Sequence, residues 1–552
     1  MLYPRSFGFM FGGAISDFVS FENHRLSRKN PEERKLDAGL RLVIVQLAAL
    51  IYFLVLFAAL ISTQIFAGSY YRNLAENNRL REILIHAPRG IIYDRNGIPL
   101  TINLPAFRLI TCDTDNQNCQ SQIISKDQEI NLETQTLPAN KHLETDSSRS
   151  YPFGPVFAPV LGYVSENSSS GGFKTGQGGV EEFYENQLRG KNGKELIEVD
   201  ATGRKLRTVF LNPPTAGRNL TLTIDANLQK VAYEALGDYK GAVVVSNPQT
   251  GAVLALVSKP SFDPNYFTDL NMAATDRSEK IQAFFNDPQK PLFDRAIAGT
   301  YPPGSTFKII TATAGLESGA ITAQTKIEDT GELVIGPYKF PNWKWLQDGG
   351  TQGILDVIGG LQKSNDIFFY KTAEATGIDN LVLWAKKFGL GSSLGIDLPG
   401  EAGGLVRRDR EWFLGDTYHE AIGQGDLLVT PIQDNAWTNV IANGGKLCRP
   451  HVLPENQDCR NLGIQESTID LIRKGLIAAC EPGGTGYPLF GFVPQIACKT
   501  GTAEYGTQSK THAWFTSFSP DISVTVLVEG GGEGSDVAAP IAKKIYEAWY
   551  GR

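Results

Sequence analysis

The sequence predicts an α+β protein that is divided into several domains. The chain has 552 residues, which is more than one hydrophobic core usually organises. Residues 42–66 are almost wholly apolar, as in a helix that crosses a membrane. Further along, strand patterns occupy 241–257 and 512–528, and helix patterns occupy 307–316 and 537–550. This mixture predicts a helix-covered sheet that follows a membrane anchor.

The apolar segment 42–66 is predicted to be an uncleaved transmembrane helix. No charged residue occurs between Leu42 and Tyr71, and about 20 apolar residues cross a bilayer. A cleavable signal peptide is the alternative, but its apolar core is usually only about 7–15 residues long. Basic residues before the segment predict that the tail 1–41 stays in the cytoplasm: Arg25, Arg28, Lys29, Arg34, Lys35 and Arg41. We therefore expect a single-pass protein of the inner (cytoplasmic) membrane, with the rest of the chain extracytoplasmic.

Two domains are predicted after the anchor. Residues 67–220 alternate short strand-like and turn segments and end in a boundary rich in turn formers at 212–217. Residues 221–552 are predicted to form the catalytic domain, in which 241–257 is a hairpin that turns at 247–251. The modest net charge of -7 gives no sign of nucleic-acid binding.

All six cysteines follow the predicted anchor. Their spacing favours three disulfides: Cys112–Cys119, Cys448–Cys459 and Cys480–Cys498. Six cysteines allow many connectivities, so other pairings stay open, as does a set of unpaired thiols. An oxidising compartment favours disulfides over thiols. Cys498 directly precedes Lys499, so a bridge there would stiffen that part of the chain.

The strongest functional signal is the pair Ser305 and Lys308. It is the only Ser-x-x-Lys pair in the chain, and it follows two prolines and a glycine at 302–304. Those residues predict an extended approach and a turn, after which 307–316 is predicted to be a buried helix. Residues three apart share a helix face, so Lys308 can reach the Ser305 hydroxyl. An isolated pair of this kind more often lies on a surface helix, but the apolar surroundings favour an active site here.

A second, weaker motif comprises Ser364, Asn365 and Asp366. It precedes a dense aromatic run that ends at Tyr370, as at the mouth of a core helix. The same Ser-x-Asn/Asp pattern occurs at four other positions, so it means little without that context: Ser125, Ser165, Ser261 and Ser519.

The third motif runs from Lys499 through Thr500 and Gly501 to Thr502. It lies before the strand patterns near the C-terminus, and a glycine in an edge strand allows the close approach of a ligand backbone. A second Lys-Thr-Gly run begins at Lys174, inside a glycine- and serine-rich stretch that predicts a flexible loop. We therefore assign the motif to Lys499.

The first and third motifs together suggest acyl-transfer chemistry. A serine hydroxyl is a weak nucleophile until a base takes its proton. Lys308 can be that base only with a neutral amine, so its pKa must be depressed. Burial, the positive end of a helix and a second cation all lower a lysine pKa, and Lys499 is the candidate cation. The N–H group of Ser305 is placed to hold an oxyanion.

The three motifs occur in the order and rough spacing of the penicillin-recognising serine enzymes, and the chain resembles the class B penicillin-binding proteins. The likeness covers most of the sequence beyond the tail. It includes six segments: Leu74–Arg79, Arg89–Gly97, Leu222–Asp225, Gly241–Val245, Pro260–Asn265 and Tyr301–Lys308. Segments 422–425, 429–433 and 512–515 resemble the elongation-type members, the penicillin-binding protein 2 group, rather than the septal type. Asp366, where many relatives carry Asn, also favours that group.

The resemblance implies an architecture. Residues 67–220 would form a β-rich pedestal, or dimerisation-like domain, with a reduced head between 107 and 149. Residues 221–552 would form the transpeptidase domain, with an antiparallel sheet covered by helices, an all-helical lobe beside it and the site in the cleft between them. Some relatives hold zinc between the first two motifs. Because residues 327–366 contain neither His nor Cys, we expect no metal, and no cofactor is implied.

The resemblance also implies residue roles. Ser305 would be the nucleophile and Lys308 its base, Ser364 would pass the proton to the leaving amine, and Asp366 would orient Lys308 or the substrate amide.

The third motif would bind the substrate. Lys499 would supply positive charge to Ser364 and to the substrate carboxylate. Thr500 and Thr502 would bind that carboxylate, and the Thr502 N–H group would complete the oxyanion hole. The implied reaction is D,D-transpeptidation: attack on a peptidoglycan stem peptide ending in D-Ala–D-Ala, release of D-Ala, and transfer of the acyl group to an amine. β-Lactams would mimic the dipeptide.

Other functions use the same residues. A D,D-carboxypeptidase or a β-lactamase would pass the acyl group to water, but the anchor and the long pedestal favour a cross-linking enzyme. A β-lactam sensor would need a cytoplasmic output domain larger than the tail, and an inactive scaffold would be expected to have lost Ser305 or Lys499. We expect no room for a glycosyltransferase domain. The resemblance therefore implies a partner, a polytopic membrane glycosyltransferase of the shape-and-elongation family.

Overall fold

The computed structural model describes most of the chain after the N-terminal tail. The chain forms two compact units, residues 1–80 and residues 81–552. The described residues are 31–113, 119–133, 138, 141–167, 173–200, 205–270, 272–406, 411–506 and 510–551.

The described part of the first unit is helical up to Arg79. Helix α1 (Pro31–Ile61) continues into a π-helical turn, η1 (Ser62–Phe66), and α2 (Gly68–Arg79) follows. Residues Gly39–Phe66 have a mean hydropathy of 2.7, and none of that apolar surface is buried in the protein. An apolar helix of 28 residues that protein does not cover is suited to lipid, and it includes the segment 42–66. The helix begins at Pro31, before the predicted segment 42–66.

The first part of the second unit is rich in small sheets. One sheet has the order β1-β8-β9 and consists of β1 (Leu80–Ile85), β8 (Gly193–Val199) and β9 (Lys205–Asn212). A second has the order β4-β3-β5 and consists of β4 (Cys119–Ile124), β3 (Ile102–Cys112) and β5 (Lys141–Ser150). The third is the hairpin of β6 (Tyr163–Asn167) and β7 (Phe173–Gln177). Short helices connect them: α3 (Lys126–Glu133), α4 (Ala158–Leu161), α5 (Gly179–Phe183) and α6 (Glu185–Leu188). The β4-β3-β5 sheet includes most of the stretch 107–149, for which the reduced head stays a prediction.

A buried ionic cluster holds this region together. The carboxylate of Glu181, which is fully buried, accepts hydrogen bonds from Arg89 Nε at 2.6 Å and Arg149 Nε at 2.7 Å. A buried charge is stable only when it is paired in this way. The Lys-Thr-Gly run at Lys174 also lies here, in β7, where the Lys174 amine forms an ion pair with Asp146 at 2.7 Å.

The second part of the second unit is built on a five-stranded antiparallel sheet of order β12-β11-β21-β20-β19. Its strands are β11 (Gly241–Ser246), β12 (Val253–Lys259), β19 (Ala497–Tyr505), β20 (Lys510–Phe518) and β21 (Ser523–Val528). Alternate residues enter cores on opposite faces, as β-strand geometry requires. Phe515 packs with α7 (Ala226–Ala235) and α17 (Ala539–Trp549), whereas Trp514 packs with the helical lobe on the other face. Both faces are therefore covered, and β19 is an edge strand.

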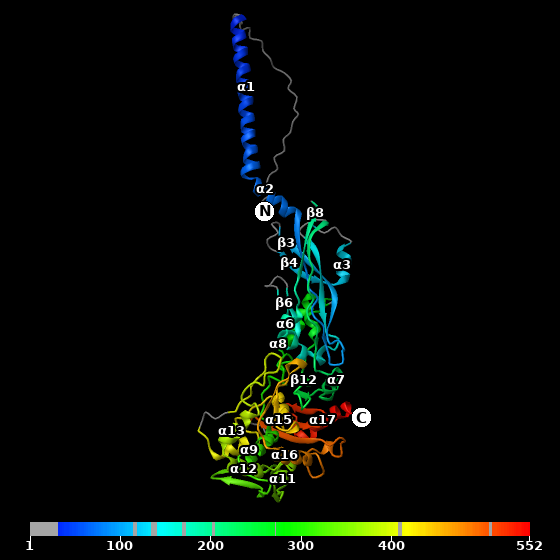
Figure 1. Cartoon of the computed structure of the whole chain (residues 1–552), viewed down its shortest axis with the longest axis vertical. Helices are drawn as coiled ribbons and strands as arrows, with labels where there is room; N and C mark the ends of the chain where they lie inside the picture. The colour runs from blue at the N-terminus through cyan, green and yellow to red at the C-terminus, as the bar shows by residue number, and fades with distance from the viewer. Residues whose placement is uncertain are drawn as a thin grey trace, which may run out of the picture. The chain divides into compact units, whose positions relative to one another are not determined.

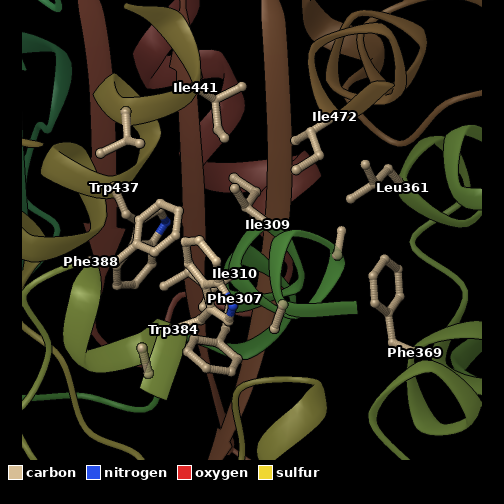
Figure 2. Close-up of a cluster of buried hydrophobic side chains, with 14 of the residues drawn as sticks. Phe307, Ile309, Ile310, Leu361, Phe369, Trp384, Phe388, Trp437, Ile441 and Ile472 are labelled. Atoms are coloured by element: carbon tan, nitrogen blue, oxygen red, sulfur yellow. The ribbon is translucent and has the colours of Figure 1, made fainter. Parts of the chain in front are cut away.

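The helical lobe surrounds α9 (Lys308–Glu317), which is buried along almost its whole length. The other helices of this region are α11 (Val357–Gln362), α12 (Asp366–Thr376), α13 (Ile378–Lys387), α14 (Leu414–Ala421), α15 (Pro431–Ala442) and α16 (Glu466–Ala479) (Figure 1). Figure 2 shows Phe307, Ile309 and Ile310 among large apolar side chains from the neighbouring helices, which include Trp384, Trp437 and Ile472. This dense packing fixes the helix that begins three residues after Ser305.

The lobe also carries small β-elements that the sequence analysis did not predict. These are the strand β13 (Ile327–Glu328) with β16 (Ile354–Leu355), the hairpin of β14 (Glu332–Ile335) and β15 (Tyr338–Pro341), and the short helix α10 (Trp343–Asp348). We call residues 327–355 the hairpin segment.

Three disulfides join all six cysteines in the same pairs that their spacing favours. Cys112–Cys119 connects β3 to β4, and Cys448–Cys459 connects β17 (Lys446–Cys448) to β18 (Cys459–Asn461). Cys480–Cys498 ties the end of α16 to β19, next to Lys499.

Candidate active site

Ser305 lies in a short 3₁₀ turn, η5 (Gly304–Phe307), that leads directly into α9. The turn packs closely against two other segments. Gly304 has a φ of 57°, and its N–H group donates to the carbonyl of Gly423 at 2.8 Å. A Cβ atom on Gly423 would lie 2.1 Å from the Gly304 carbonyl oxygen, so only glycine fits there. The backbone of Ser305 is thus held between α9 and the loop that contains Gly423.

Lys308, the first residue of α9, is fully buried. Its Nζ donates to Asp366 Oδ1 at 2.6 Å, to the Ser364 carbonyl at 2.8 Å and to Ser364 Oγ at 3.4 Å. Within the described part of the chain, Ser305 Oγ makes no hydrogen bond. In this structure the Lys308 amine therefore contacts the second motif rather than the Ser305 hydroxyl.

The second motif forms the start of α12. Asn365 caps this helix, because its Oδ1 accepts from the N–H group of Phe368 at 2.7 Å. Asp366 is the first helical residue, and its Oδ2 accepts from Trp343 N at 2.8 Å. Ser364 has a φ of 53°, in the left-handed region that residues other than glycine seldom adopt.

Lys499 reaches the same point from β19. Its side chain is fully buried, and its Nζ donates to Ser364 Oγ at 2.7 Å and to the Thr500 carbonyl at 2.9 Å. The Ser364 hydroxyl therefore lies between two buried lysine amines, Lys308 and Lys499. All three sequence motifs meet here.

The pKa values of both lysine amines in this cluster are lowered. Burial lowers the pKa of the Lys308 amine, and the Asp366 carboxylate opposes this effect. Burial also lowers the pKa of Lys499 well below its usual range, and the positive charge of Lys308 adds to this effect. The Asp366 carboxylate lies next to Lys308, so it favours the charged form of Lys308 more strongly than that of Lys499. The repulsion between the two amines is mutual, and it favours a single positive charge on this pair of lysines.

The remaining residues of the third motif, Thr500, Gly501 and Thr502, lie in β19. Thr500 Oγ1 is 2.7 Å from Thr485 Oγ1, and Thr502 is exposed, with its Oγ1 accepting from Gly534 N at 3.5 Å. A Cβ atom on Gly501 would lie 2.9 Å from Trp514 Cβ and 3.0 Å from the Pro303 carbonyl oxygen. Glycine at 501 thus lets β19 approach the turn that carries Ser305.

Several residues of the site carried no sequence signal. Thr485 belongs to a turn and reaches Thr500 only through the fold. Asn342 and Trp343 lie in the hairpin segment and contact Asp366. Their side chains come from a segment without periodicity, so no pattern in the sequence could have identified them.

His512, the histidine nearest to the third motif in the chain, has a packing role. Its ring stacks on Tyr505 with 3.9 Å between ring centroids, and its Nδ1 accepts from Gly530 N at 3.2 Å. Burial lowers the pKa of His512 to about 4, so the ring is neutral at physiological pH. Among the residues that the structure describes, no group of three or more His, Cys, Asp or Glu side chains could hold a metal ion.

Comparisons with known proteins agree with this arrangement. Residues 241–547 match the penicillin-binding protein transpeptidase domain, and residues 123–222 match the penicillin-binding protein dimerisation domain. The chain is 31% identical over 591 residues to the peptidoglycan D,D-transpeptidase MrdA of Escherichia coli K12, covering 90% of this chain and 92% of that protein. It is 32% identical over 449 residues to the peptidoglycan D,D-transpeptidase PbpA of Mycolicibacterium smegmatis, covering 72% and 84%.

Solved structures give the same result. The penicillin-binding protein PBP2 of Helicobacter pylori, in its complex with MreC, has a TM-score of 0.75 and 26% identity, covering 85% of this chain and 100% of that one. Pseudomonas aeruginosa PBP2 in complex with WCK 5153 has a TM-score of 0.68 and 30% identity, covering 85% and 96%. A chain of a peptidoglycan synthase complex, studied for the coordination of polymerization and crosslinking, has a TM-score of 0.73 and 29% identity, covering 93% and 98%.

Proposed function

Because this chain belongs to the class B penicillin-binding proteins and is a peptidoglycan D,D-transpeptidase of the PBP2 type, we propose that Ser305 is its nucleophile. Ser305 Oγ attacks the carbonyl carbon of the D-Ala–D-Ala bond, and its proton passes to the Lys308 amine. The N–H groups of Ser305 and Thr502 hold the oxyanion that forms. The single observation that supports these roles best is the position of Ser364 Oγ between the amines of Lys308 and Lys499.

The Lys308 amine must lose its proton before it can act as a base. The Ser364 hydroxyl contacts both buried amines, so it can take up a proton from Lys499 and release one to it. When a substrate carboxylate binds near Lys499, it favours positive charge on that amine. The proton then moves from Lys308 through Ser364 to Lys499, and Lys308 becomes a neutral base. Substrate binding itself would thus activate the nucleophile.

The same hydroxyl serves the next step. Collapse of the tetrahedral intermediate breaks the C–N bond, and Ser364 gives a proton to the nitrogen of the leaving D-Ala while it takes from Lys308 the proton that came from Ser305. An amine of a second stem peptide then attacks the acyl-enzyme on Ser305, which forms the cross-link and frees the serine. A β-lactam follows the first step only, because its ring opens without releasing a leaving group from the site.

The apolar helix and the solved synthase complex support two further proposals, on membrane anchoring and on a partner. The apolar helix 39–66 anchors the chain in the cytoplasmic membrane, with the tail inside and the catalytic unit outside. A membrane glycosyltransferase of the shape-and-elongation family supplies glycan strands. The solved peptidoglycan synthase complex supports this partnership by its likeness over 93% of this chain.

The assignment is tested by labelling the full-length membrane protein with a fluorescent penicillin and identifying the labelled peptide by mass spectrometry. We expect the label on Ser305 and no label on a Ser305→Ala variant. Label on another residue would refute the assignment. In a separate assay with the glycosyltransferase present, cross-linked peptide dimers are expected, whereas released D-Ala without dimers would indicate a carboxypeptidase.

A further inference from the structure

A buried carboxylate outside the three motifs holds the hairpin segment together. Asp329 is 4% exposed, and its Oδ1 accepts from Gly331 N at 2.9 Å. Its Oδ2 accepts three further hydrogen bonds, from Asn342 Nδ2 at 2.8 Å, Gln352 N at 2.8 Å and Asn365 Nδ2 at 2.9 Å. A carboxylate with four donors is fully satisfied, and no neutral amide could replace all four contacts.

The partners of Asp329 hold both neighbours of Ser364. On one side, the side chain of Asn365 is bonded to Asp329 and to Gln352 Oε1 at 2.8 Å. On the other side, the Lys363 carbonyl accepts from Trp343 Nε1 at 3.1 Å and from Gln352 Nε2 at 3.4 Å. The backbone that carries Ser364 is therefore fixed before and after the serine by one segment.

The restrained backbone includes Ser364, which has an unusual conformation. Ser364 adopts a left-handed backbone conformation, which a non-glycine residue keeps only when its surroundings impose it. That conformation directs the Ser364 hydroxyl to the two buried lysine amines. The end of α11 sets this conformation, because Ser364 N donates to the Leu361 carbonyl at 3.2 Å and Asn365 N donates to the Gly360 carbonyl at 3.0 Å. The hairpin segment holds this end of α11 in place through Lys363 and Asn365.

The same segment also orients Asp366. The Asp366 N–H group donates to Asn342 Oδ1 at 3.1 Å, and Asp366 Oδ2 accepts from Trp343 N at 2.8 Å. The other oxygen of Asp366 is thereby left to face Lys308. Ser364 and Asp366, which both contact the Lys308 amine, thus depend on the same set of buried hydrogen bonds.

We propose that the hairpin segment positions Ser364 for proton transfer and that Asp329 is the positioning residue at its centre. This inference rests on the proposed role of Ser364. Asp329 touches no reacting atom. It acts through Asn342, Gln352 and Asn365, and its loss would let the end of α11, which carries Ser364, shift away from the lysine amines.

The test compares Asp329→Asn with a matched control, Asp397→Asn. Asp397 is also a fully buried carboxylate with four donors: Val452 N, Leu453 N, Tyr184 Oη and Asn456 Nδ2. It contacts none of the three motifs. Both variants should unfold at a lower temperature than the parent chain, by a similar amount, because each loses one buried acceptor for several donors.

Acylation kinetics separate the two variants. For the full-length protein, the first-order rate of acylation by a fluorescent penicillin is measured over a range of drug concentrations, which separates it from the noncovalent affinity. Asp329→Asn should lower this rate by about tenfold to a hundredfold, because small displacements of catalytic groups have effects of that size. The affinity should change little, and Asp397→Asn should keep the parent rate. Equal rates for the two variants, or a loss confined to affinity, would overturn the proposal.

Two further variants guard against simple misfolding. Trp343→Phe removes the indole N–H donor to the Lys363 carbonyl and makes a partly exposed ring smaller, so it should slow acylation in a protein of near-normal thermal stability. The exchange Asp329→Asn with Asn365→Asp returns a carboxylate to the network and should recover part of the rate. Unchanged acylation by Trp343→Phe together with no recovery in the exchange would contradict the proposal. Mass spectrometry of the labelled Asp329→Asn protein separates the proposed nucleophile from the proposed positioning role. Label away from Ser305 would refute the assignment of the nucleophile, whereas label on Ser305 at the parent rate would refute only the positioning role of Asp329.

Discussion

The ion pair between Lys308 and Asp366 makes the pH dependence of acylation a test of the proposed base. Two unit charges 2.6 Å apart interact by roughly 6 kcal/mol at an effective dielectric constant of about 20. Shifts caused by an opposite charge at such short range are usually about 1–3 pKa units, each worth about 1.4 kcal/mol. Asp366→Asn removes the charge but keeps an acceptor for Trp343. We therefore expect the pKa of the Lys308 amine to fall, because the Asp366 charge that opposes the effect of burial is gone.

Because Lys308 is the proposed base, its pKa determines how the acylation rate changes with pH. Lys308 accepts the Ser305 proton only when its amine is neutral, so acylation slows as pH falls through the pKa of that amine. A lower pKa moves this acid limb to lower pH, and below the parent pKa the variant should acylate faster than the parent. Lys499 should shift in the same direction, because Asp366 raises its pKa as well.

The assay is stopped-flow acylation by a fluorescent penicillin from about pH 5 to 9, with the rate at saturating drug plotted against pH. Asp348→Asn is the matched control, since Asp348 forms an exposed ion pair with Lys344 in the hairpin segment. That variant should keep the parent profile. An acid limb that stays in place or moves to higher pH in Asp366→Asn would show that Lys308 is not the base.

Three other outcomes are expected. Glu181→Gln should lower the free energy of unfolding by about 3–5 kcal/mol in denaturant titration, because Arg149 loses its buried carboxylate while Arg89 keeps only its ion pair with Glu185. The acylation rate of this variant should match the parent, and a loss below about 1 kcal/mol would contradict the cluster's importance. Replacing Cys480 and Cys498 by alanine opens a loop of 18 residues and should cost about 3 kcal/mol in the same titration under oxidising conditions; no difference from the parent would mean that the bridge does not stabilise the fold. Gly501→Ala places a methyl group 2.9 Å from Trp514 Cβ and should slow acylation about tenfold by moving β19 from the Ser305 turn; a normal rate would show that this close approach is not required.

The sequence predicted the parts of the site that are carried by local patterns. Ser305 and Lys308 could be assigned because a proline–glycine approach followed by an apolar helix is a local signal. Lys499 and the strands beside it could be placed for a similar reason, since β-branched and aromatic runs mark buried strands. The long apolar helix near the N-terminus followed from length and hydropathy alone.

Other parts depend on long-range packing and had no such signal. Asp329 is 36 positions from its partner Asn365, and nothing in either local sequence indicates that contact. The left-handed conformation of Ser364 ends α11 at a position where glycine is the usual signal, and the sequence has serine there instead. The distribution of charge between Lys308 and Lys499 depends on which amine lies next to Asp366, which only the three-dimensional arrangement determines.

The position of β19 at the end of the sheet limits how a peptide can reach Ser305. Helices cover both broad surfaces of the sheet, and among the described strands β19 pairs only with β20. A stem peptide can therefore approach along the outer side of β19 in extended form, as a temporary sixth strand. Recognition in this form relies on main-chain groups, so the enzyme can accept stem peptides that differ in their side chains while it still demands a correctly shaped backbone next to the scissile bond.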